Sequence, residues 1–182
     1  MDLTLISIVA GLGLTELLLN FYRLVRDRRH VSWDALPLVW AMLILVAVVN
    51  FWWGIRAIMA DVSGWTTGDF LLSMVAPIFL FLACAAALPS ITSGEHADMK
   101  ALYAEQRTAF LIFFLGYQAV NWVLDASGLT GGWPPRVVLI HRTAVCVGLA
   151  VALVGRSRRW DWMAVAVIAA AYALRLITQV AH

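Results

Sequence analysis

Apolar residues fill six long runs of the chain, and short polar segments rich in arginine, glycine and tryptophan separate the runs. A helix crosses a bilayer with about 20 mostly apolar residues, and each run is long enough for this. The pattern therefore predicts an all-α integral membrane protein, a six-transmembrane-helix bundle in which residues 1–182 form one domain. The predicted spans cover approximately residues 3–23, 35–58, 70–89, 107–125, 136–155 and 161–181.

The composition agrees with a surface that faces lipid. The chain is 63% hydrophobic and 13% charged, whereas a soluble domain is about half apolar and a quarter charged. The net charge of +2 does not indicate a nucleic-acid partner, because the basic residues collect in short segments between the spans. We expect the lipid bilayer to be a partner of this protein and nucleic acid not to be one.

The basic residues are distributed unevenly over the predicted connections. Nine of them lie near the connections that follow the first, third and fifth spans: Arg23, Arg26, Arg28, Arg29, Lys100, Arg107, Arg156, Arg158 and Arg159. Connections rich in arginine and lysine stay in the cytoplasm. The sequence therefore predicts a multi-pass protein of the bacterial inner (plasma) membrane, with both termini outside, in the periplasm.

Two further patterns concern the connections. Residues 97–107 (ADMKALYAEQR) predict a short amphipathic helix that lies at the interface and leads into the fourth span. Residues 24–34 (LVRDRRHVSWD) resemble residues 153–162 (LVGRSRRWDW), as a weak repeat of helical hairpins would require. Convergence is the favoured explanation of this similarity, because any such hairpin turn collects arginine and tryptophan.

Polar residues inside the spans follow helical spacing. An ionisable group at membrane depth is costly unless it faces the bundle interior or has a partner. Spacings of three, four and seven residues place such groups on one face of the first, fourth and sixth spans, and the second and fifth spans add others. The candidate solute or ion pathway comprises Glu16, Asn20, Asn50, Arg56, Gln118, Asn121, Asp125, His141, Arg142, Tyr172 and Arg175.

Positive charge prevails in the outer half of this set. Arg56, Arg142, Arg175 and His141 accompany a single carboxylate, Asp125. Such an excess favours an anionic ligand, such as a carboxylate, a phosphate or chloride. Asp125 is also the expected ion-pair partner of Arg142. A purely structural interpretation of these residues is the alternative to a pathway. In it, the arginines near span ends extend to the membrane interface, and the amides form hydrogen bonds between helices.

The inner half of the set centres on one carboxylate, Glu16, with Asn20 one turn away. A carboxylate in an apolar helix needs a proton or a partner. We expect that partner to be Arg23, Arg107 or the segment 103–106.

The sequence lacks the patterns of several chemistries. It has no nucleotide-binding glycine loop, no nucleophile elbow and no H-E-x-x-H. Only His141 among the histidines falls inside a span, and Lys100 falls outside all of them. Cys84 and Cys146 are too few for a metal site. We therefore predict no catalytic residues, no metal and no cofactor.

Three functions fit these observations. The first is a small channel or transporter for a small anionic or proton-coupled solute, acting as a homo-oligomer and losing flux on replacement of Glu16 by glutamine or Arg175 by alanine. The second is a non-catalytic accessory or assembly subunit of a larger membrane complex. The third, an enzyme that acts on a lipid headgroup, is least expected, because no residue spacing is specific to it.

Overall fold

The structure is a computed structural model, which describes residues 4–58, 66–91, 96–126 and 136–180. Six helices lie within these residues, and all six are long and apolar enough to cross a membrane. The prediction of a multi-pass helical membrane protein is thereby confirmed. The helices are α1 (Thr4–Arg26), α2 (Ala35–Ile58), α3 (Thr67–Ala87), α4 (Met99–Ala126), α5 (Arg136–Gly155) and α6 (Arg158–Val180).

Local interactions explain where α3 begins and ends. Thr66 and Asp69 form a capping box, in which the Asp69 backbone N–H donates to the Thr66 hydroxyl (3.2 Å) and the Thr66 backbone N–H donates to the Asp69 carboxylate (2.9 Å). This cap satisfies backbone donors at the helix start. The helix therefore begins three residues before the predicted span, and it ends before Leu88, which has an extended backbone and precedes Pro89.

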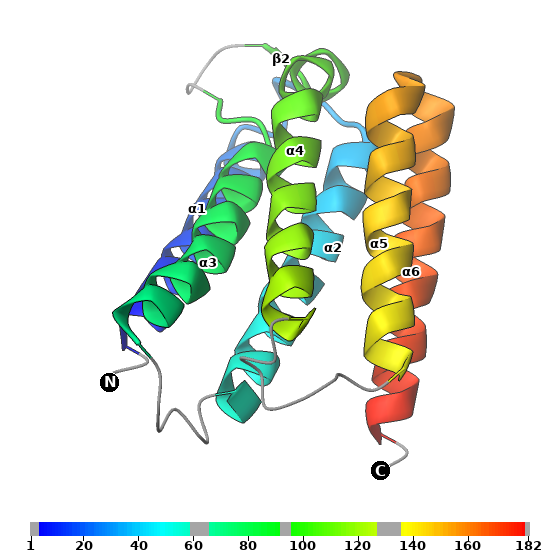
Figure 1. Cartoon of the computed structure of the whole chain (residues 1–182). Helices are drawn as coiled ribbons and strands as arrows, with labels where there is room; N and C mark the ends of the chain where they lie inside the picture. The colour runs from blue at the N-terminus through cyan, green and yellow to red at the C-terminus, as the bar shows by residue number, and fades with distance from the viewer. Residues whose placement is uncertain (1–3, 59–65, 92–95, 127–135, 181–182) are drawn as a thin grey trace.

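The fourth helix is longer than the predicted span. Met99–Ala126 is one helix, so the expected interfacial segment 97–107 is largely continuous with the span that it precedes. In Figure 1 the first turns of α4 are viewed nearly end-on above the bundle, whereas the rest of the helix runs down through it. From Met99 onward the segment is helical, as predicted, without a break between it and the span.

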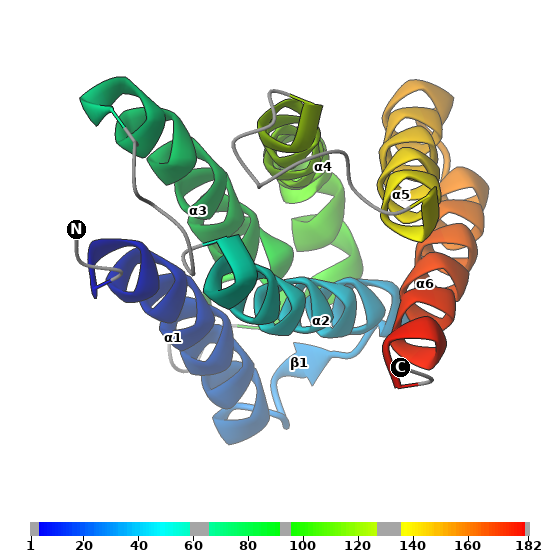
Figure 2. The same ribbon diagram turned by 60° about the horizontal axis from the view of Figure 1, so that its bottom comes forward.

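The second helix occupies the centre of the bundle. In its span 56% of the residues are buried, compared with 28–39% in the other five. Helix α3 packs between α1 and α4, while α5 packs against α4 and α6 (Figures 1 and 2). Helix α2 contacts α1, α3, α4 and α6. A helix with neighbours on most sides is apolar on nearly every face, as the sequence of α2 is.

Aromatic rings fill the space between α2 and α4. Trp40 is fully buried and meets Phe110 edge to face, with ring centroids 5.3 Å apart. Phe114 follows at 6.0 Å from Phe110, and Tyr117 continues the series at 6.3 Å and also contacts Phe51. Such contacts add to the stability provided by burial alone. The series leads from the end of the bundle where α2 begins toward the polar residues described below.

Glycines allow two close helix contacts. A Cβ at Gly13 of α1 would lie 3.0 Å from the Cα atom of Phe81 on α3. On α5, a Cβ at Gly148 would lie 3.3 Å from the side chain of Ile168 on α6. Small residues at such positions let two helix backbones approach closely. They therefore fix α1 against α3 and α5 against α6.

Both ends of the described chain lie at the same end of the bundle, and the connections α1–α2, α3–α4 and α5–α6 lie at the other (Figure 1). We call the latter the arginine end. There β1 (Val31–Ser32) and β2 (Ala97–Asp98) pair in parallel, and the Ala97 N–H donates to the His30 carbonyl (2.9 Å). This short pairing joins the first and third connections.

Two ion pairs extend these links at the arginine end. Arg158, at the start of α6, donates from both terminal nitrogens to Asp34, which also accepts from the Leu36 backbone N–H at 3.1 Å. Arg107 of α4 donates to both carboxylate oxygens of Asp161 at 2.7 and 2.8 Å. The Arg107 guanidinium also donates to the Ala152 carbonyl at 2.5 Å, so one side chain joins α4, α5 and α6.

The Asp34 pair predicts how stability depends on pH. The guanidinium of Arg158 lowers the pKa of the Asp34 carboxyl below its ordinary value. A lowered pKa adds stability above the unfolded-state value, about 3.9, and this contribution is lost as the pH falls through the folded-state pKa. We expect Asp34→Asn to lower the unfolding midpoint at pH 7, and the difference from the parent to shrink as the pH falls below the unfolded-state value. Denaturant unfolding of both proteins across this range measures the difference, and a constant difference would contradict the assignment.

Candidate functional site

Six polar residues from α4, α5 and α6 meet in the half of the bundle near the chain ends. We call them the three-helix cluster: Gln118, Asp125, His141, Arg142, Tyr172 and Arg175. Gln118, Asp125, His141 and Tyr172 are each less than 7% exposed. Helical spacing predicted that the members on α4 share a face and that those on α6 do too, and the packing of α5 against α4 and α6 brings them together with His141 and Arg142.

A phenol connects two of the helices. The Gln118 side-chain amide donates to the Tyr172 hydroxyl at 3.2 Å, between α4 and α6. The His141 ring of α5 meets the Tyr172 ring edge to face, with centroids 4.6 Å apart, and faces the backbone of Ala171. Tyr172 therefore contacts both the amide of α4 and the imidazole of α5.

An ion pair joins α4 to α5. A terminal nitrogen of Arg142 lies 2.9 Å from a carboxylate oxygen of Asp125, and the two side chains are 12% and 7% exposed. The predicted pairing of Asp125 with Arg142 is therefore present in the structure. The pair links α4 and α5, which are consecutive along the chain, in the half of the bundle near the chain ends.

The cluster contains more positive than negative charge. Arg175 of α6 lies close enough to His141, Arg142 and Tyr172 to interact with them electrostatically. With Arg142 and Arg175 positive and Asp125 negative, the cluster has a formal charge of +1 when His141 is neutral. A partly buried excess of positive charge favours an anion in contact with it.

Two buried nitrogens of the cluster have no hydrogen-bond partner among the described residues. They are Nη1 of Arg142 and Nδ1 of His141. Buried polar atoms nearly always have a protein or water partner, so such exceptions call for a ligand, a water molecule or a proton. Nη1 is an obligatory donor, whereas Nδ1 donates or accepts according to the tautomer.

Other predicted site residues lie apart from the cluster or bond within their own helix. The side-chain amide of Asn50 donates to the Val46 carbonyl at 3.0 Å, and that of Asn121 donates to the Tyr117 carbonyl at 2.7 Å. Each amide thus has one hydrogen-bond partner within its own helix. The side chain of Arg56 lies outside the described part of the structure.

Glu16 and Asn20 form a separate ladder on α1. Asn20 is 1% exposed; its amide N–H donates to Glu16 at 3.4 Å, and its carbonyl accepts from Arg23 at 3.0 Å. Arg23 is thus the basic residue linked to Glu16, through Asn20. Arg107, another expected partner, pairs instead with Asp161.

The buried contacts of Asp161 were not anticipated from the sequence. This residue is 1% exposed and accepts hydrogen bonds from Arg107 and, at 3.4 Å, from the Tyr103 hydroxyl. It lies in the first turn of α6, beside tryptophans and arginines typical of a solvated end. Its spacing from other polar residues gave no signal, because its partners belong to a helix 54 residues away in sequence.

The described residues contain no group of three or more histidine, cysteine, aspartate or glutamate side chains that could hold a metal ion. Cys84 and Cys146 are free thiols. Comparison with protein-family models, with curated proteins and with solved structures finds no match. The chemistry of the three-helix cluster is therefore the basis on which a function is proposed.

Proposed function

We propose that this protein is a small channel or transporter, and that the three-helix cluster binds its solute, a small anion. The observation that carries the proposal is Nη1 of Arg142, a buried donor without a hydrogen-bond partner among the described residues. A guanidinium can bind a carboxylate, a phosphate or a halide through its N–H donors. A carboxylate or phosphate oxygen, or chloride, near Nη1 would satisfy this donor.

The surrounding charges support an anion rather than a cation. Asp125 already faces Arg142 at 2.9 Å, so a cation would have to compete with that guanidinium for the carboxylate. Arg175 adds a second positive charge nearby. Glu16, midway along α1, is the candidate site for a coupled proton or ion.

We also infer that the arginine end faces the cytoplasm and that both termini lie outside, in the periplasm of a bacterial inner membrane. The concentration of basic residues in the three connections at that end supports this orientation. A reporter enzyme that is active only outside the cytoplasm, fused after the last residue, should be active in cells. An inactive fusion, with the same reporter active when fused within the α1–α2 connection, would reverse the orientation.

Flux through purified protein tests the transport proposal. The protein is reconstituted into vesicles, and efflux of chloride, inorganic phosphate and acetate is measured. We expect efflux of at least one anion above that of empty vesicles, and a reduction of about tenfold or more in Arg175→Gln, the size expected from losing one charge-assisted hydrogen bond. Glu16→Gln should reduce flux driven by a proton gradient.

Arg136→Gln is the matched control. Arg136 is exposed at the same end of the bundle and loses the same charge on substitution, so flux should stay within about twofold. Equal losses in both variants would contradict a specific role for the cluster. Native mass spectrometry of the protein extracted from its membrane separates the alternatives: a homo-oligomer agrees with transport, whereas stoichiometric partner chains without flux would favour an accessory subunit.

A further inference from the structure

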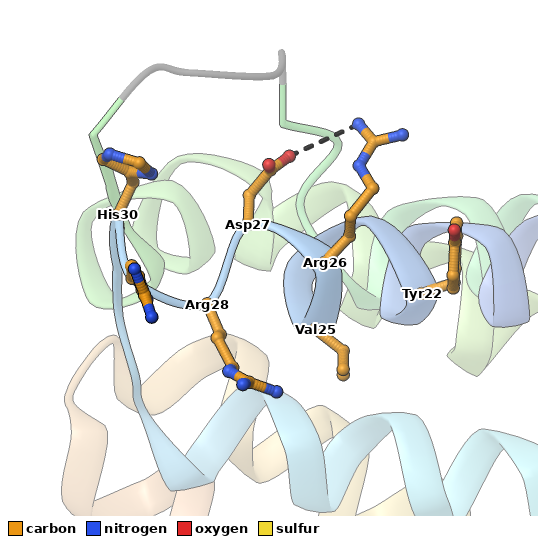
Figure 3. A pocket seen from close by; sticks show the side chains of 7 residues that line it. Tyr22, Val25, Arg26, Asp27, Arg28 and His30 are labelled. Atoms are coloured by element: carbon orange, nitrogen blue, oxygen red, sulfur yellow. Dashed lines mark hydrogen bonds and ion pairs between the residues drawn. The ribbon is translucent and has the colours of Figure 1, made fainter.

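A surface hollow of about 460 Å³ lies at the arginine end, away from the three-helix cluster. Side chains of the last turn of α1 and of the segment that leads to β1 line it (Figure 3). Figure 3 shows Arg26 and Asp27 on one side of the chain and Arg28 extending to the other. The lining residues are Tyr22, Val25, Arg26, Asp27, Arg28, Arg29 and His30.

The charge of the hollow suits a phosphate. Three arginines and one aspartate give a formal charge of +2 with His30 neutral. Arg26 lies 3.4 Å from Asp27, while Arg28 and Arg29 are exposed and have no ion-pair partner among the described residues. Two guanidiniums are therefore available for an anion with several oxygens, which can accept bidentate hydrogen bonds.

The apolar part of the hollow indicates where that phosphate comes from. Tyr22 and Val25 are 58% and 38% exposed, and Leu18, one turn before Tyr22, is 51% exposed. They belong to a span of which only 28% is buried, so this face of α1 borders lipid tails. Because the span ends at Arg26, the arginines that follow lie at the level of the headgroups.

We propose that this hollow binds the headgroup of an anionic phospholipid. Arg28 and Arg29 hold the phosphate, and His30 and Arg26 border it. The acyl chains lie along the exposed face of α1 past Tyr22, whose ring spans the boundary between apolar and polar regions. Basic pockets beside transmembrane helices commonly bind such headgroups. The site is independent of the proposed transport function.

Native mass spectrometry of the full-length protein in detergent tests the site. The protein is titrated with phosphatidylglycerol and with phosphatidylcholine of the same acyl chains, and bound lipids are counted. We expect phosphatidylglycerol to bind more tightly, and its affinity to fall by about tenfold or more in Arg28→Gln/Arg29→Gln. Both arginines are exposed, so the double variant should keep the unfolding midpoint of the parent.

The control is Arg156→Gln/Arg159→Gln, which removes the same charge from two exposed residues at the same end, one in the α5–α6 connection and one in the first turn of α6. Its affinity for phosphatidylglycerol should change by less than about twofold. Equal losses in the two double variants would show only diffuse attraction and would overturn the proposal. Competition by inorganic phosphate as strong as that by phosphatidylglycerol, with no preference over phosphatidylcholine, would assign the hollow to free phosphate instead.

Discussion

Replacing Asp161 with asparagine is expected to lower the free energy of unfolding by about 3–5 kcal/mol, because it leaves the guanidinium of Arg107 buried without a counter-charge. The two side chains are 12% and 2% exposed, and three hydrogen bonds of 2.7–3.0 Å join them. Asparagine retains the size of aspartate but offers one acceptor oxygen and no charge. Unfolding in mixed detergent micelles, followed by circular dichroism, measures the loss.

Asp27→Asn is the matched control for this prediction. Asp27 also pairs with an arginine at the arginine end, but Arg26 is 48% exposed and the two groups are 3.4 Å apart. An exposed pair of this kind contributes about 1 kcal/mol or less. If Asp161→Asn cost no more than the control, the Arg107 pair would not hold α4 against α5 and α6, and Arg107 would have to find another partner.

Arg142→Met is expected to cost about 3–5 kcal/mol when made alone, whereas the double variant Asp125→Leu/Arg142→Met should recover most of that loss. The single change removes the guanidinium that faces a buried carboxylate at 2.9 Å, while the double change replaces both charged groups by apolar side chains. Unfolding of the two single variants and the double variant gives the coupling energy. Two independent, additive losses would show that Asp125 and Arg142 do not depend on one another.

The same double variant also separates packing from function in the three-helix cluster. If Arg142 binds an anion, the double variant should fold and yet have lost anion efflux from vesicles, because the donor Nη1 is gone. If the ion pair only holds α4 to α5, the folded double variant should retain efflux. The conservative variant Arg142→Lys keeps the charge but not the fork of donors, so it should retain only part of the flux.

Hydropathy alone was sufficient to predict the spans, and the reason is physical. Each span must bury its backbone polar groups within its own helix, so an apolar run of the right length determines a helix without reference to its neighbours. The ends of α2 and α5 agree with the prediction for this reason. The start of α3 differs by three residues because the Thr66–Asp69 cap, rather than hydropathy, decides where it begins.

Helical spacing likewise predicted which polar residues share a face, but not which faces meet. Gln118, His141 and Tyr172 come together because α5 packs between α4 and α6, a choice made by close contacts such as that at Gly148. The polar side chain of Asn50 suggested that it joins a shared pocket, yet its amide donates to the Val46 carbonyl of its own helix. An asparagine amide can donate to the carbonyl one turn earlier in its own helix, so its position in the sequence says little about contacts with other helices.

The sequence by itself determined the class of protein, the number of spans and the grouping of basic residues in alternate connections, because these follow from the transfer of each segment into lipid. Only the tertiary structure decided that α2 is central, that Arg107 pairs with Asp161 and that three helices share one cluster. Lipid tails are as apolar as leucine, so burial gives no preference among helix neighbours. Close contacts at small residues and ion pairs between residues distant in sequence determine which helices are neighbours, and these contacts exist only in the packed structure.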